Sequence, residues 1–128
     1  MNSNQGIGNG VNILVAEDDE ISYLLIEEML SEYNVKILHA ENGEESIRIV
    51  KENPEISLVL MDVKMPVMNG LDACMTIRQF NPTIPIIAQS AYTSSYDRDR
   101  AFRSGCNDFI SKPFDKEKLL SVIKKYSS

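Results

Sequence analysis

The 128-residue chain, 43% of it hydrophobic, can bury one core but leaves little room for a second domain. Its 19 acidic residues outnumber its 13 basic ones and give a net charge of -6, which argues against direct nucleic acid binding, because a phosphate backbone attracts clustered Lys and Arg. No run approaches the roughly 18 apolar residues of a membrane span, and none near the start resembles a signal peptide, so we expect a cytoplasmic domain without membrane contact.

The cysteines Cys74 and Cys106 and the single histidine, His39, do not have the spacing of zinc ligands. We expect both thiols to be buried as small hydrophobic groups in a reducing cytoplasm. His39 lies within an apolar run, and we expect its role to be structural.

Residues 1–10 are polar and glycine-rich, which predicts a flexible tail or linker and leaves residues 11–128 for the domain. Short apolar runs then predict strands, each followed by a segment with helical signals. The expected strands span about 11–16, 35–40, 57–61, 84–88 and 107–110. The expected helices run to about residue 33, from Asn42-Gly43 to before Pro54, over 71–77, over about 94–104 before Gly105, and over 119–126.

Strand and helix therefore alternate five times. Such alternation predicts the α/β class, with a single doubly wound parallel sheet of five strands, right-handed crossovers and helices on both faces. The short connections suit one compact domain.

Four of the apolar runs end abruptly in polar residues whose side chains can bind ligands or react. They are followed by Glu17-Asp18-Asp19, by Asp62, by Gln89-Ser90 and by Ser111-Lys112-Pro113. Because ligands bind beyond the carboxyl ends of parallel strands, one edge of the sheet should gather carboxylates, a hydroxyl and an ammonium group. Clustered carboxylates require a cation, whereas the hydroxyl and the lysine suit an anion beside it. A metal ion with a phosphoryl group satisfies both demands.

In their order and spacing, the segments ILVAEDDE, LVLMDVKMPVMNG, IIAQSA and DFISKPF resemble the receiver domain of two-component response regulators. The resemblance covers about residues 11–126, and the EDDE and NDFISKPF segments are similar to receivers attached to hybrid sensor kinases. It implies the flavodoxin-like strand order 2-1-3-4-5.

By this resemblance, Asp62 is the phospho-acceptor, since carboxylates can act as nucleophiles and form acyl phosphates. The resemblance also implies a Mg²⁺ site, in which Mn²⁺ can substitute. Asp18 and Asp62 would bind the metal directly, Glu17 largely through water, and the backbone carbonyl of Lys64 would complete the protein ligands. We expect Asp19 to cap the first helix, where an Asp faces free backbone N–H groups.

Ser90 matches the switch hydroxyl of the family, and Lys112 matches the lysine that binds a phosphoryl oxygen. The resemblance implies a cis peptide bond between Lys112 and Pro113. Phe109 matches the switch aromatic, where Tyr is frequent, so any signal must come from the position of its ring. Gln89 stands where the family usually has an apolar residue, and the sequence offers no physical reason for it.

The resemblance implies a signalling domain that takes a phosphoryl group from phosphohistidine of a sensor histidine kinase or a histidine phosphotransfer domain and then switches conformation. Such a domain catalyses its own phosphorylation and dephosphorylation, and a hybrid parent would be a histidine kinase. The fourth helix has the fewest apolar anchors and is expected to move. We expect the face formed by the fourth helix, fifth strand and fifth helix to be the one available for a dimer. We expect a stand-alone receiver or the cytoplasmic part of a larger protein, such as a membrane-anchored hybrid kinase.

Three other functions were open on the sequence. A haloacid-dehalogenase-type phosphatase also uses an Asp after a strand, but it needs a second Asp where this chain has Lys64, and it usually carries a cap. A flavodoxin-like electron carrier needs a phosphate loop after the first strand, where Glu17-Asp18-Asp19 would repel an anion. A receiver that docks without phosphorylation is disfavoured by the complete set of acidic, Asp, Ser and Lys residues.

Overall fold

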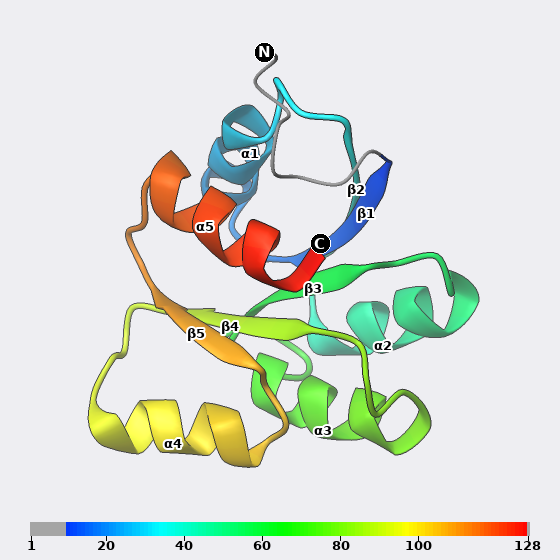
Figure 1. Cartoon of the computed structure of the whole chain (residues 1–128). Coiled ribbons are helices and arrows are strands. Elements are labelled where there is room, and N and C mark those ends of the chain that lie inside the picture. The colour runs from blue at the N-terminus through cyan, green and yellow to red at the C-terminus, as the bar shows by residue number, and fades with distance from the viewer. Residues whose placement is uncertain (1–9, 128) are drawn as a thin grey trace.

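The computed structural model describes residues 10–127, so residues 1–9 of the tail predicted over residues 1–10 lie outside the described part of the chain. Strands and helices alternate along it (Figure 1). The strands are β1 (Val11–Ala16), β2 (Val35–Ala40), β3 (Leu58–Asp62), β4 (Ile86–Ser90) and β5 (Asp108–Ser111). The helices are α1 (Glu20–Met29), α2 (Gly43–Glu52), α3 (Gly70–Phe80), α4 (Ser95–Arg103) and α5 (Lys116–Ser127). Within residues 10–127, no helix is long and apolar enough to cross a membrane.

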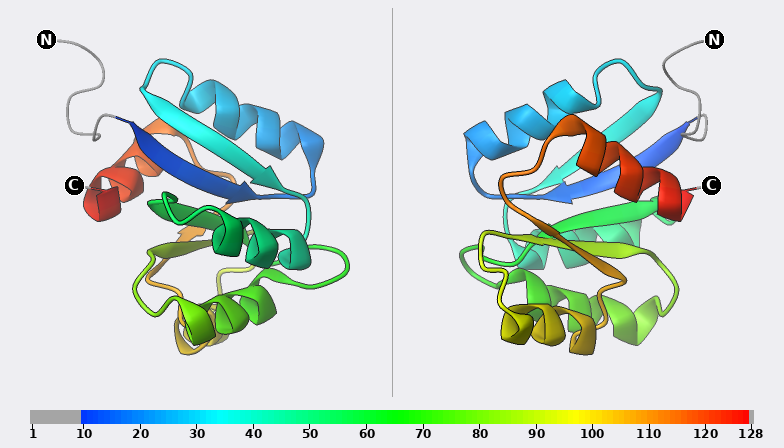
Figure 2. Two further views of the ribbon diagram at one scale, coloured as in Figure 1. Left: turned by 90° about the vertical axis from the view of Figure 1, so that its right-hand side faces the viewer. Right: turned by 60° about the vertical axis from the view of Figure 1, so that its left-hand side comes forward.

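All five strands are parallel and form one sheet in the order β2-β1-β3-β4-β5, which confirms the predicted fold. Helices α1 and α5 cover one face of the sheet, and α2, α3 and α4 cover the other (Figures 1 and 2). The strand order reverses between β1 and β3. In a sheet of this kind, the crevice at the carboxyl ends of those two strands is the place where ligands bind.

Each face of the sheet has its own hydrophobic core. Towards α1 and α5, the sheet contributes fully buried residues such as Ile13, Leu60 and Ile87. Towards α2, α3 and α4, it contributes Leu14 and Met61. Neighbouring residues of a strand enter different cores because successive side chains point to opposite faces. Burial on both sides explains why the strands are continuous apolar runs in the sequence.

Both cysteines are buried in the core on the side of α2, α3 and α4, as predicted. Cys74 and Cys106 are free, and their Sγ atoms lie 3.6 Å apart. They therefore fill core space between α3 and the start of β5.

The predicted bounds of the fourth strand are wrong by two residues, because 84–88 was expected and Ile86–Ser90 is observed. Pro85 has no backbone N–H to contribute to the ladder, so regular pairing starts after it. At the other end, Gln89 and Ser90 continue the pairing with β3 and β5 although they are polar. Gln89 is thus paired on both sides, with Asp62 and Ile110, and Ser90 is paired with Ser111 of β5.

Polar caps fix where two helices begin. Asp19 caps α1 and accepts hydrogen bonds from the backbone N–H and the hydroxyl of Ser22, at 2.9 and 2.8 Å, which confirms its predicted role. Asn42 caps α2 in the same way, accepting a backbone N–H at 2.9 Å. Because the cap fixes the start of α1, only Glu17, Asp18 and Asp19 connect β1 to the helix, and we call this segment the acidic link.

The buried face of α1 differs from the apolar pattern in the sequence. Ile21, Leu24 and Leu25 belong to that pattern, but they are 70%, 49% and 55% exposed. Ile26 and Leu30 are the buried anchors of this segment. The helix therefore presents a row of apolar side chains to solvent, and contiguous exposed apolar surface is typical of a contact surface.

Candidate functional site

Three carboxylates meet where β1 and β3 end. Glu17 and Asp18 follow β1, and Asp62 is the last residue of β3. One carboxylate oxygen from each of them lies within 4.8 Å of the others. Glu17 and Asp62 are only 1% and 5% exposed, whereas Asp18 faces solvent. The predicted grouping of these three residues is therefore confirmed.

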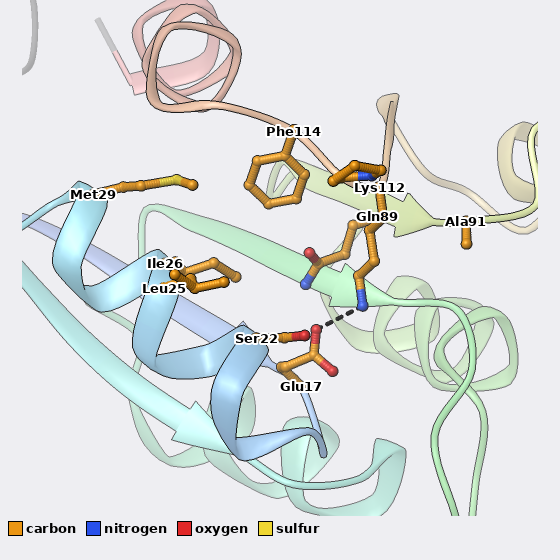
Figure 3. Close-up of a pocket in the computed structure, with 10 residues that line it drawn as sticks. Glu17, Ser22, Leu25, Ile26, Met29, Gln89, Ala91, Lys112 and Phe114 are labelled. Atoms are coloured by element: carbon orange, nitrogen blue, oxygen red, sulfur yellow. Dashed lines mark hydrogen bonds and ion pairs between the residues drawn. The ribbon is translucent and has the colours of Figure 1, made fainter.

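Lys112 reaches this cluster from the position directly after β5. Its Nζ lies 2.7 Å from Oε1 of Glu17 (Figure 3) and 3.1 Å from Oδ2 of Asp62. Its backbone N–H donates to the carbonyl of Ser90 at 2.8 Å, and its peptide bond to Pro113 is cis, as predicted. One ammonium group faces two buried carboxylates and one exposed one, so the cluster still attracts a cation.

The electrostatics of the cluster raise the pKa of Asp62 to about 7, through burial and through the hydrogen bond and charge of Glu17. Lys112 acts in the opposite direction without outweighing them. Burial alone would lower the pKa of Lys112, but the two carboxylates raise it overall, so the ammonium stays charged. The cluster therefore tends to hold a proton that a divalent cation would displace.

The loop between β3 and α3 folds closely against Asp62. The backbone N–H of Lys64 donates to Oδ1 of Asp62 at 3.2 Å, and that of Gly70 donates to the carbonyl of Val63 at 3.0 Å. A Cβ atom on Gly70 would overlap the carbonyl oxygen of Asp62 and lie 2.8 Å from Cγ of Met61. Only glycine fits at this position. The predicted role of the Lys64 carbonyl as a metal ligand stays a prediction.

Ser90 and Phe109, the two predicted switch residues, line the same cavity of about 240 Å³. Ser90 is buried at the end of β4. Phe109 is also buried, and the guanidinium carbon of Arg98 lies 5.1 Å from the centre of its ring. The shared cavity offers space into which either side chain can move, and the role of both residues as a switch stays a prediction.

His39 supports Glu17 from the neighbouring strand. The carbonyl oxygen of Glu17 accepts a hydrogen bond from Nε2 of His39 at 2.8 Å, and the imidazole stacks on Tyr23 with centroids 3.7 Å apart. The register of β1 and β2, which pairs Val15 with His39, places the ring within reach. The expected structural role of His39 is thus specified as support for the acidic link.

Gln89 is the residue of this region that sequence reasoning left without a role. It is 0% exposed, and among residues 10–127 neither its Nε2 nor its Oε1 has a hydrogen-bond partner. Its side chain lies on the α1 and α5 side of the sheet, in the cavity drawn in Figure 3. The one available signal was a polar residue at a position where a buried strand requires apolar ones.

The donor atoms of the acidic cluster fit a hard divalent cation. Three carboxylates supply oxygen ligands, which Mg²⁺ and Mn²⁺ prefer, and the exposure of Asp18 leaves room for the water that Mg²⁺ keeps. The nearby imidazole of His39 has its Nε2 engaged with the Glu17 carbonyl. The site is therefore an oxygen site.

Comparisons with known proteins agree with this geometry. Residues 13–124 match the response regulator receiver domain family, and the chain belongs to that family. Over 122 residues it is 38% identical to hybrid signal transduction histidine kinase K of Dictyostelium discoideum, a match that covers 88% of this chain and 10% of that protein. The chain thus spans about a tenth of the length of that relative.

Two solved structures share the fold at 29% sequence identity. One is a chain of the co-crystal structure of the Saccharomyces cerevisiae histidine phosphotransfer signaling protein Ypd1 and the receiver domain of its downstream response regulator Ssk1, with a TM-score of 0.87 over 93% of this chain and 90% of that one. The other is the receiver domain of sensor histidine kinase PA1611 from Pseudomonas aeruginosa PAO1, with a magnesium ion coordinated in the active site cleft. Its TM-score is 0.84 over 91% of this chain and 97% of that one.

Fold, acidic cluster and family membership together define a receiver domain of two-component phosphorelay signalling. This is the function that the sequence predicted. It is favoured over the phosphatase and the electron carrier, which share features of the fold but belong to other families.

Proposed function

We propose that this domain takes a phosphoryl group from a phosphohistidine onto the carboxylate of Asp62 and then changes conformation. The observation that carries the proposal is the position of Lys112, whose Nζ lies 2.7 Å from Glu17 and 3.1 Å from Asp62. An ammonium group already bound to the nucleophile can follow the charge onto an arriving phosphoryl oxygen.

In the proposed step, an oxygen of Asp62 bonds to phosphorus while the P–N bond to the donor's imidazole breaks, and the electron pair of that bond stays on the imidazole nitrogen. Only the carboxylate form of Asp62 is nucleophilic, and a pKa of about 7 puts its ionisation within the physiological range. Lys112 and the backbone N–H of Lys64 both contact the carboxylate and can stabilise the charge that shifts during transfer. Hydrolysis of the acyl phosphate would be the domain's own second reaction.

A Mg²⁺ ion bound here would neutralise charge on the transferred oxygens and relieve repulsion among the carboxylates. The residues that would hold it are Asp18 and Asp62, with Glu17 and the backbone carbonyl of Lys64. Mn²⁺ would be accepted by the same oxygen donors. The similarity to the PA1611 receiver domain with its coordinated magnesium ion supports this assignment.

The donor would dock on the exposed apolar row of α1. Ile21, Leu24 and Leu25 lie on the helix that starts directly after the acidic link, so a partner bound there can bring its phosphohistidine to Asp62. The similarity to a co-crystal structure that contains a histidine phosphotransfer protein and a receiver domain supports a donor of that kind, or the histidine kinase itself. These partners and a cytoplasmic setting belong to the proposal.

The response would run from the phosphate through Ser90 to Phe109, which share a cavity. Arg98 on α4 contacts the ring of Phe109, so a shift of that ring would reach α4. The face formed by α4, β5 and α5 is then the surface on which a phosphorylation-dependent dimer could form. This stays part of the proposal.

The acceptor can be tested by incubating the chain with acetyl phosphate, with and without Mg²⁺, reducing the product with borohydride and locating the modified residue by mass spectrometry. We expect labelling that requires Mg²⁺ and occurs on Asp62. Asp62→Asn should abolish it, whereas the matched control Asp99→Asn, at an exposed position on α4, should not. Labelling of Asp62→Asn at the wild-type level would contradict the assignment and would favour a receiver that acts by docking alone.

A further inference from the structure

A cavity of about 330 Å³ lies on the α1 side of the Lys112–Glu17 ion pair, separate from the opening beside Asp18 (Figure 3). Its volume falls at the lower end of the roughly 300–1,000 Å³ typical of small-ligand sites. Most of its wall is apolar and comes from α1 and from the link between β5 and α5. The apolar residues are Leu25, Ile26, Met29, Ala91, Pro113 and Phe114.

Gln89 places a carboxamide in this apolar cavity. Figure 3 shows the amide between Ile26 and Phe114, close to the stem of Lys112. The residue is 0% exposed, and throughout residues 10–127 no group bonds to its Nε2 or its Oε1. Buried polar groups are almost always hydrogen-bonded, because leaving them unpaired is unfavourable. The unpaired amide therefore points to a ligand that completes it.

We propose that this cavity binds a small, uncharged, planar molecule with an apolar body and a carboxamide-like edge. A carboxamide has both a donor and an acceptor, so another primary amide or a lactam can pair with Gln89 through two hydrogen bonds. The thioether of Met29 and the ring of Phe114 suit an aromatic body. A charged ligand is disfavoured because Lys112 is already matched by two carboxylates and most of the remaining wall is apolar.

Binding there would also affect the acceptor site. Lys112 and Glu17 line this cavity and also belong to the acidic cluster, so an occupant can bias the position of the ammonium. We expect it to change the rate at which Asp62 is labelled, and this consequence rests on the proposed function. The binding itself does not depend on phosphorylation.

The test is an NMR titration of the metal-free chain, observed through the methyl groups of Ile26 and Met29. The probes are benzamide, N,N-dimethylbenzamide, which cannot donate, and toluene, which has no polar edge. We expect benzamide to shift both methyl signals and to bind at least about tenfold more tightly than the other two, since an unmatched buried amide is penalised. Gln89→Leu should lose this preference for benzamide, and Gln79→Leu, at an exposed position on α3, should keep it.

Two results would overturn the proposal. If benzamide shifts neither methyl signal up to its solubility limit, the cavity holds water only. If toluene and benzamide bind the wild type with equal affinity, Gln89 does not form hydrogen bonds with the carboxamide of the ligand. Should Gln89→Leu fail to fold, Met29→Phe fills the cavity instead, and unchanged benzamide binding by that variant would place the ligand elsewhere. Because the readout is binding without phosphate, its failure is distinguishable from failure of Asp62 labelling.

Discussion

The Oγ atom of Ser90 accepts a hydrogen bond from the backbone N–H of Tyr92 at 2.9 Å. This bond uses the oxygen only as an acceptor, so the hydroxyl keeps its own proton for donation. Asp62 ends the neighbouring strand, and a phosphoryl oxygen on it would be a suitable acceptor. Under the proposed function, Ser90 can therefore donate to the phosphoryl group while it stays bonded to Tyr92.

Removal of this hydroxyl should separate acceptance of the phosphoryl group from the response to it. Ser90→Ala should still be labelled on Asp62, because the nucleophile and Lys112 remain, although more slowly. Its conformational response should be smaller, because residue 90 then has no hydroxyl to bond to the phosphoryl group and so to affect the position of Phe109. Hydrogen exchange over residues 90–110, with and without beryllofluoride as a phosphate mimic, measures this response.

Ser90→Thr is the matched control, since it keeps the hydroxyl and should respond nearly as the wild type does. If Ser90→Ala shows the same change in hydrogen exchange as the wild type, the hydroxyl of Ser90 is not needed for the conformational response. The switch would then run through other contacts of the acceptor site.

Asp62→Asn should stabilise the metal-free protein, because it removes one of three mutually repelling carboxylates from a buried position. We expect the free energy of unfolding at pH 8 to rise by about 1–3 kcal/mol, given that each unit of raised pKa corresponds to about 1.4 kcal/mol. Millimolar Mg²⁺ should raise the melting temperature of the wild type by binding the folded state, and that of the variant much less. Thermal and urea unfolding measure both effects, with Asp99→Asn as control. An unchanged wild-type melting temperature in Mg²⁺ would argue strongly against a metal site.

The metal-free protein should lose stability as pH rises from about 4 to about 7. The pKa of Asp62 is about 7 in the folded state against a model-peptide value of 3.8, so in that window the folded state binds more protons than the unfolded state. The contribution of Asp62 is therefore fully present below pH 3.8 and is lost as pH passes through about 7. Urea unfolding of the wild type and of Asp62→Asn from pH 5 to pH 8 measures this contribution as the difference between their free energies of unfolding.

Mg²⁺ should reverse part of this trend, because the ion competes with the proton on Asp62. Its affinity should increase as pH rises towards and past about 7. A Mg²⁺ affinity that is constant over this range would mean that Asp62 is already ionised in the metal-free protein.

Gly70→Ala should destabilise the fold and disturb the acceptor. An added Cβ would overlap the carbonyl oxygen of Asp62, and the backbone there is fixed by the first turn of α3. We expect a loss of about 3 kcal/mol in the free energy of unfolding, as for overpacked core positions. Gly10→Ala is the comparison, because Gly10 has open space around it and only a left-handed φ of 74°. The free energy of unfolding of Gly10→Ala should fall by only about 1 kcal/mol. An equal loss of stability in both variants would contradict the close packing of Gly70.

The fold was predictable because its signals are local. Strands buried on both faces are apolar runs whatever their neighbours, and the caps at Asp19 and Asn42 follow from the residue types. The end of β4 was not predictable in the same way, since Gln89 is held in the strand by β3 and β5 and Ser90 by β5. The exposed row on α1 was also missed, because periodicity does not tell which side of an apolar helix faces the sheet.

The acceptor cluster was predictable because parallel strands bring their carboxyl ends together, so Glu17, Asp18 and Asp62 had to meet. The hydrogen-bond partners of the residues around this cluster could not be predicted from the sequence. The bond from His39 to the Glu17 carbonyl depends on the register of β1 and β2. The unpaired amide of Gln89 depends on how α1 packs on the sheet, which no local pattern specifies.

The ion pair between Lys112 and Glu17 joins residues 95 positions apart. A ribosome therefore adds Glu17 and Asp62 well before it adds Lys112, which pairs with both of them. Until β5 docks beside β4, the acidic pocket has no ammonium group and cannot hold an arriving phosphoryl group in the way described above. A chain truncated before Lys112 would thus lack an ammonium group on which the proposed phosphoryl transfer depends.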